Sequence, residues 1–90
     1  MAVWSFDRQA VKIDGDDQAL VKRLAEPLRE ALADRHSYYA VHIDAMDRVG
    51  EVVVSIDGTN GHVPLLFRFE DLDPGYVCRV VKDTVRQFDI

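Results

Sequence analysis

The order of hydrophobic periods along this 90-residue chain constrains its fold more than any other feature. Apolar residues recur every three to four positions over residues 17–36, every second position over 38–69, and every three to four positions again over 74–90. The outer two periods are typical of amphipathic helices, and the middle one of half-buried strands. We therefore predict one α+β domain over residues 1–90: a three-stranded antiparallel meander with two helices on one face.

Residues 1–15 show only weak alternation, and we interpret them as an extended N-terminal segment. Val11 and Ile13 alternate with polar residues at its end, so the segment can supply an extra edge strand. The run from Asp14 to Asp17 predicts a turn whose carboxylates cap the following helix. Trp4 and Phe6 either seal the core or stand out as anchors for a partner, and the sequence leaves both open.

The first helix is expected to begin near Gln18 and to end near His36. Pro27 lies inside it and has no amide donor, which predicts a kink or a break into two pieces. The expected buried stripe consists of Leu20, Leu24, Leu28, Ala31 and Leu32.

The short links between the three expected strands allow a test of register, because facing residues of an antiparallel pair point to the same side of the sheet. If Met46 faces Glu51 and Asp57 faces His62, the two turns independently place all the alternating apolar residues on one side. These residues are Tyr39, Val41, Ile43, Ala45, Val52, Val54, Ile56, Val63, Leu65, Phe67 and Phe69.

The second helix has a strong start signal at Asp73 and Pro74, since an aspartate caps free amides and proline suits the first helical position. It is expected to run to residue 90. Its predicted inner stripe consists of Val77, Val80, Val81, Thr84 and Phe88.

The charge of the chain disfavours several classes of partner. Sixteen acids against eleven bases give a formal net charge of -5, which disfavours phosphate backbones and anionic lipid. Cys78 is the single cysteine, so no intrachain disulfide or cysteine-based zinc site is expected. Met1 to Phe6 shows no signal-peptide pattern, and we expect a cytoplasmic protein with no membrane contact. An excess of arginine over lysine, with much Ala, Val and Asp, is typical of a bacterial chain.

Candidate chemistry is sparse. His42, Asp44 and Ser55 would lie together on the outer side of the sheet, but nothing near them predicts a pocket, a nucleophile elbow or an oxyanion hole. His36, His42 and His62 are spaced unlike a metal site. We expect no catalytic, metal or cofactor-binding residues, and hence a protein that is not an enzyme.

The outer side also carries an apolar streak, which can mark a contact with a protein partner or with a second copy. Scattered exposed residues, or burial beneath the N-terminal segment, explain the same pattern equally well. The candidate partner-binding residues are Tyr38, Met46, Val53, Pro64 and Leu66, together with His42 and Trp4.

From Asp17 to Ile90 the order of elements resembles the double-stranded-RNA-binding domain, which also packs two helices on one face of a three-stranded antiparallel sheet. The resemblance implies the architecture. It also implies a histidine-bearing loop between the first two strands and a lysine cluster at the second helix start. Here those positions read Asp47-Arg48-Val49-Gly50 and Asp73-Pro74-Gly75-Tyr76, with acid where phosphate would bind.

Together these patterns predict a non-enzymatic protein–protein interaction or regulatory module. The alternative is a nucleic-acid-binding domain that uses Arg23, Arg29 and Arg35 on the first helix as a basic strip.

Overall fold

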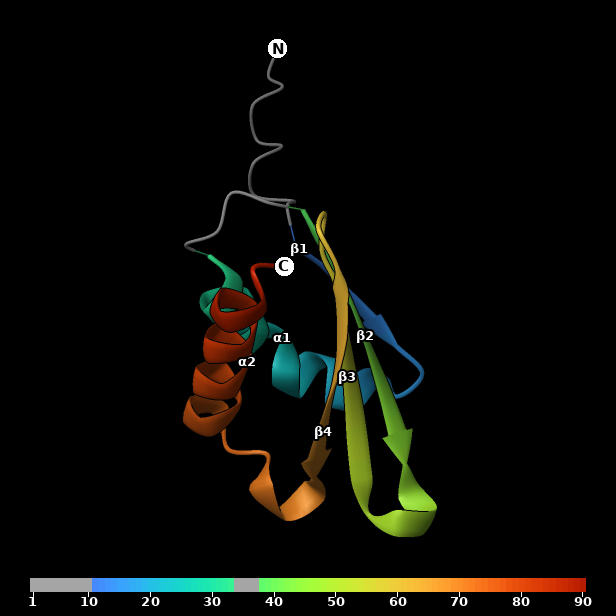
Figure 1. Cartoon of the computed structure of the whole chain (residues 1–90). Helices are drawn as coiled ribbons and strands as arrows, with labels where there is room; N and C mark the ends of the chain where they lie inside the picture. Colours follow the sequence, from blue (N-terminus) through green and yellow to red (C-terminus); the bar gives the residue numbers. More distant parts are fainter. Residues whose placement is uncertain (1–10, 34–37) are drawn as a thin grey trace.

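The computed structural model describes residues 11–33 and 38–90, which form a four-stranded sheet and two long helices (Figure 1). In chain order the strands and helices are β1 (Val11–Gly15), α1 (Gln18–Leu32), β2 (Tyr39–Met46), β3 (Glu51–Asp57), β4 (His62–Arg68) and α2 (Pro74–Phe88). Two short 3-10 turns, η2 (Asp47–Val49) and η3 (Phe69–Asp71), follow β2 and β4. The predicted α+β class and the mostly antiparallel sheet are confirmed.

The sheet has the strand order β1-β2-β3-β4. The predicted register is confirmed on both hairpins, with Met46 opposite Glu51 and Asp57 opposite His62. The extra edge strand is β1, which runs parallel to β2. The predicted turn at Asp14 begins too early, because Asp14 and Gly15 still pair with β2.

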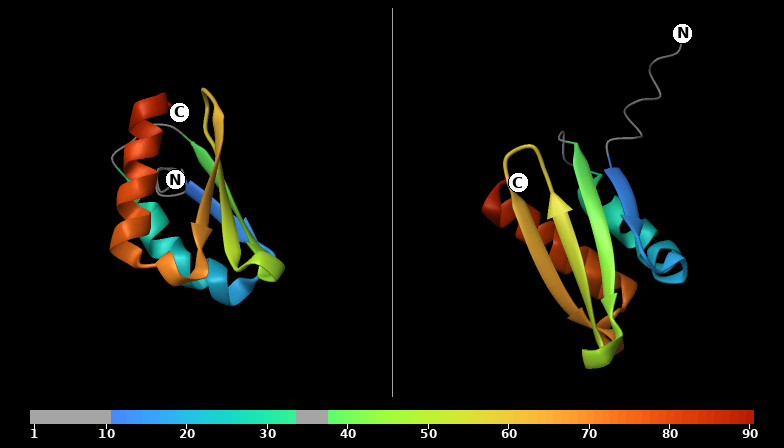
Figure 2. Two further views of the ribbon diagram at one scale, coloured as in Figure 1. Left: turned by 60° about the horizontal axis from the view of Figure 1, so that its bottom comes forward. Right: turned by 90° about the vertical axis from the view of Figure 1, so that its right-hand side faces the viewer.

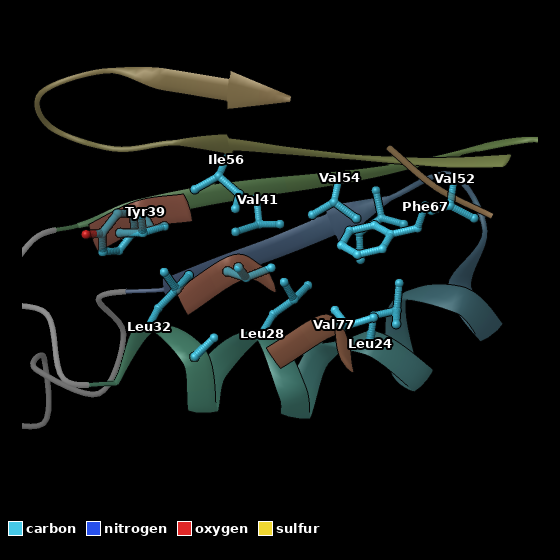
Figure 3. Close-up of a cluster of buried hydrophobic side chains, with 14 of the residues drawn as sticks. Leu24, Leu28, Leu32, Tyr39, Val41, Val52, Val54, Ile56, Phe67 and Val77 are labelled. Atoms are coloured by element: carbon cyan, nitrogen blue, oxygen red, sulfur yellow. The ribbon is translucent and has the colours of Figure 1, made fainter. Parts of the chain in front are cut away.

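Both helices cover the same face of the sheet and leave the other face open (Figure 2). The buried core lies between the layers, where side chains from α1 and α2 meet those of the strands (Figure 3). Leu24, Leu28, Val52, Val54, Ile56, Val77 and Val81 have no exposed area. Strand alternation and helix period thus converge on one apolar layer.

Helix α1 is one continuous helix over residues 18–32, so of the two predicted outcomes at Pro27, a kink or a break, the break is wrong. Pro27 is itself buried between two turns that bury Leu24 and Leu28, and this packing offsets the amide that proline lacks. Asp17 caps the helix, with its carboxylate accepting from the amides of Ala19 and Leu20. The predicted end near His36 falls in residues 34–37, outside the described residues.

Helix α2 begins as predicted, with Asp73 accepting from the amide of Tyr76. The predicted inner stripe is partly wrong, because Phe88 is 61% exposed while Val85 is buried. The helix also stops at Phe88: Asp89 takes a left-handed conformation with φ of 52°, and this reversal turns Ile90 into the core. The Tyr39 hydroxyl donates to the backbone oxygen of Ile90 at 2.8 Å.

Neither α1 nor α2, the helices of the described ranges, is long and apolar enough to cross a membrane.

Candidate interaction surface

The open face of the sheet is built by the polar half of each strand's alternation. The register stacks its side chains in rows that cross the strands. One row contains Lys12, Ala40, Asp57 and His62; the next contains Asp14, His42, Ser55 and Pro64; the third contains Asp44, Val53 and Leu66; and the last contains Met46, Glu51 and Arg68. Figure 2 shows this face in its right-hand view, with the helices behind the sheet.

The apolar centre of this face consists of Val53, Pro64 and Leu66. Val53 and Leu66 are direct cross-strand neighbours, and Pro64 lies two residues from Leu66 on the same side. Leu66 is 61% exposed, Pro64 is exposed and Val53 is half-buried. Three of the predicted partner-binding residues are therefore adjacent and accessible.

The remaining predicted residues do not join this centre as one patch. Tyr38 and Met46 are exposed, but they lie at opposite ends of β2, roughly 25 Å apart at the rise of a strand. Met46 faces Glu51, which in turn faces Arg68, so Met46 has charged neighbours. Trp4 lies outside the described residues.

His42 has a hydrogen-bond partner that the sequence analysis missed. Its Nδ1 lies 2.8 Å from Oδ1 of Asp14, directly across the parallel β1–β2 pair. A carboxylate only accepts, so Nδ1 carries the proton. The hydrogen bond to Asp14 is the main cause that raises the pKa of His42. Desolvation acts against it, and the charges of Asp14, Asp16 and Asp44 add to the rise. Asp44, the acid expected near this ring, contributes only through its charge.

Ser55 follows His42 in the same row, so an acid, an imidazole and a hydroxyl cross three neighbouring strands. The side chains of His42 and Asp14 are 52% and 67% exposed, respectively. The hydrogen bond to Asp14 orients the imidazole, and both side chains stay open to solvent. The sequence did carry a signal for this contact. Polar Lys12 and Asp14 alternate with apolar Val11 and Ile13, and this alternation could have placed Asp14 on the open face beside His42.

Two neighbouring hollows lie at the end of the open face where Asp14, His42 and Ser55 are found. The first, of about 350 Å³, is lined by Asp14, His42, Ser55 and His62 among others. The second, of about 380 Å³, lies against Tyr38 and the Gly58 turn. Lys12, Ala40 and Asp57 border both hollows. This end of the face is accordingly polar and uneven, whereas the centre is apolar.

On the opposite side of the molecule, a groove of about 630 Å³ separates the outer surfaces of α1 and α2. Its charged rim mixes both signs: Lys22, Arg23, Glu26 and Glu30 on α1, with Arg79 and Lys82 on α2. The Cys78 thiol lies 3.9 Å from the Glu30 carboxylate. Mixed charge of this kind is typical of a solvated rim between two helices.

Two of the three arginines of the basic strip predicted for nucleic acid, Arg23 and Arg29, contact other elements from α1. The Arg23 guanidinium donates to the backbone oxygen of Leu72 at 3.3 Å, beside α2. The Arg29 guanidinium donates to the backbone oxygen of Val11 at 3.0 Å, beside β1. The two side chains thus point to different sides of the helix, and Arg35 lies outside the described residues.

Within residues 11–33 and 38–90, no three His, Cys, Asp or Glu side chains are grouped so that they could hold a metal ion. Comparison with protein-family models, with curated proteins and with solved structures found no match.

Proposed function

We propose that the protein is a non-enzymatic interaction module that binds a protein through the open face of its sheet. The observation that carries this proposal is the apolar centre of Val53, Pro64 and Leu66 on a face that neither helix covers. Leu66 in particular exposes 61% of its surface, whereas Val52, Val54 and Ile56 on the helix-covered side of the sheet have no exposed area.

The composition of this face fits a protein partner better than a small ligand. An apolar centre with charged residues around it is the usual arrangement of a protein contact. Charged and polar residues border the apolar centre on two sides. On one side lie Asp44 and the facing residues Glu51 and Arg68. On the other side lies the hydrogen-bonded pair of His42 and Asp14. Small-ligand sites are instead concave and enclosed.

The test compares Val53→Asp and Leu66→Asp with the unchanged protein as bait in extracts of the native host. Both side chains point away from the core, so the variants should fold while placing a charge in the apolar centre. We expect proteins retained by the unchanged bait to be lost by both variants, at least about tenfold by quantitative mass spectrometry.

Lys22→Gln is the matched control, since Lys22 lies on α1 in the groove at the far side of the molecule. It should retain the same proteins as the unchanged bait. Retention that survives both aspartate variants, or no specific retention by any bait, would contradict the proposal.

A further inference from the structure

The strand β4 ends the sheet with an edge that no other described strand pairs. Hydrogen bonds at both ends of the β3–β4 hairpin define which of its backbone groups face that edge. The Gly58 amide donates to the Gly61 oxygen at 2.7 Å, and the Phe69 amide donates to the Gly50 oxygen at 3.1 Å. Bonded and non-bonded pairs alternate along an antiparallel ladder. The bonded β4 residues are therefore Val63, Leu65 and Phe67, and the amides and carbonyls of His62, Pro64, Leu66 and Arg68 point outward.

Pro64 supports this assignment, because a proline inside a strand is tolerated where its missing amide would face the edge. The same proline is the main guard on this edge. Natural edge strands are protected by charges, prolines and bulges. β4 carries one charged side chain, Arg68, at its last position, so most of the strand between His62 and Arg68 is uncharged.

On the helix-covered side of the sheet, the apolar residues next to the β4 edge are not fully covered by α2. Val63 and Leu65 on β4 are only partly buried, although both belong to the inner side of the sheet. On α2, the helical period places Val80, Thr84 and Phe88 along one stripe, on the flank away from Cys78 and Lys82 in the groove beside α1. Val80 and Thr84 are half-buried, and Phe88 is 61% exposed. The apolar layer therefore reaches the surface along β4.

We propose that β4 pairs antiparallel with β4 of a second copy, so that two sheets join into one across a two-fold axis. Charge favours a second copy at this edge. The protein carries a net charge of -5, and β1, β2 and β3 each contain an acid, whereas β4 has none. Two acidic copies repel least where they meet along this strand.

The overlap of the two strands selects the register, because every register lacks the two amides of the two Pro64 residues. Pairing Pro64 with Pro64 of the second copy would set Arg68 opposite residue 60, outside β4, so the Arg68 amide would have no strand partner. Pairing Pro64 with Leu66 of the second copy, and His62 with Arg68 of the second copy, gives every remaining outward amide a carbonyl. This register also places Leu65 against Leu65 of the second copy on the inner side, where it extends the apolar layer.

The inference goes beyond the proposed function, since it uses the backbone edge and the inner flank rather than the centre of the open face. In the joined sheet, the two open faces become one continuous surface with Pro64 and Leu66 of both copies at its middle. The proposed partner surface would then be twice as large.

The test exploits the opposite effects of adding and removing an edge amide, measured as dimer dissociation constants by sedimentation equilibrium. Pro64→Val restores an outward amide and keeps the position apolar, so it should tighten the dimer by about tenfold or more. Arg68→Pro removes an outward amide and should loosen it by a similar factor. The backbone of Arg68, with φ of -90° and ψ of 151°, is close to what proline adopts.

Arg68→Ala is the matched control, because it removes the side chain and its exposed 3.7 Å ion pair with Glu70 but keeps the amide. It should leave the dissociation constant within about twofold. Far-UV circular dichroism and thermal melts of each variant check that the monomer folds.

Three outcomes would overturn the inference: an unchanged protein that stays monomeric at its solubility limit, equal effects of Arg68→Ala and Arg68→Pro, or a dimer insensitive to both proline changes. A dimer of the last kind that Val53→Asp disrupts would instead indicate stacking of two open faces. That result would reject edge pairing and still support the proposed function.

Discussion

At the scale of single residues, the exposed pair of His42 and Asp14 is the most specific polar contact of the open face. It joins side chains from two parallel strands at 2.8 Å. The hydrogen bond to Asp14 is the main reason that the pKa of His42 is raised from 6.5. A raised pKa in the folded protein means that folding binds the proton more tightly, so the contact favours the folded state at low pH.

The sign of the pH dependence follows from this. The contribution of the pair is fully present below pH 6.5 and is lost as the pH rises through the raised pKa of His42. We expect Asp14→Asn to return the pKa of His42 toward its ordinary value in an NMR titration of the ring protons. Asp44→Asn is the control and should move the pKa less, because Asp44 acts through its charge alone. A larger effect of Asp44→Asn would show that Asp14 does not hold the ring.

At the scale of elements, the contact of β1 with β2 depends on Gly15. A Cβ at this position would overlap the backbone oxygen of Ile43 and lie 2.9 Å from Cγ2 of Val21. Glycine therefore lets the end of β1 approach both the neighbouring strand and the first turn of α1.

Gly15→Ala should accordingly lower the free energy of unfolding by about 1–3 kcal/mol, since backbone must shift to admit the methyl group. Urea unfolding measures this change. Gly61→Ala is the matched control, because a Cβ there would lie 3.7 Å from Cγ1 of Ile90, an ordinary contact distance. If both variants lost the same free energy of unfolding, the close contact of Gly15 with the Ile43 backbone would not limit which residue can stand there.

The same elements explain which parts of the fold were predictable. The hairpin registers follow from the sequence because short turns restrict which residues can face each other, and one-residue slips would expose the apolar set. The parallel pairing of β1 has no such turn, since a whole helix separates Gly15 from Tyr39. The Asp14–His42 contact was missed for that reason.

The errors in the helices have a different cause. Periodicity places Phe88 near the inner stripe of α2, but Phe88 lies on the flank of the helix with Val80 and Thr84, where it is 61% exposed while Val85 is buried. Likewise, the missing amide of proline predicts a kink or a break at Pro27, whereas burial of Pro27, Leu24 and Leu28 keeps α1 continuous. The candidate site was predicted at its centre, Val53 with Leu66, because that centre depends only on the hairpin register.

At the scale of the whole molecule, charge and architecture point to different partners. The order of elements led the sequence analysis to expect an arrangement like that of a double-stranded-RNA-binding domain, but the net charge is -5 and the second helix starts at an aspartate. Phosphate backbones are bound by clustered cations that release counterions. We therefore expect the arrangement of helices and sheet alone to give no affinity for nucleic acid.

We expect no retardation of duplex RNA or DNA in mobility-shift assays, even in low-salt buffer where phosphate contacts are strongest. The side chains of Arg23 and Arg29 already donate to the backbone oxygens of Leu72 and Val11, on different sides of α1. They therefore present no continuous basic surface. Retardation that salt weakens, and that the double variant Arg23→Ala and Arg29→Ala abolishes, would instead establish a nucleic-acid-binding domain. It would also show that these two side chains leave their carbonyl partners to bind phosphate.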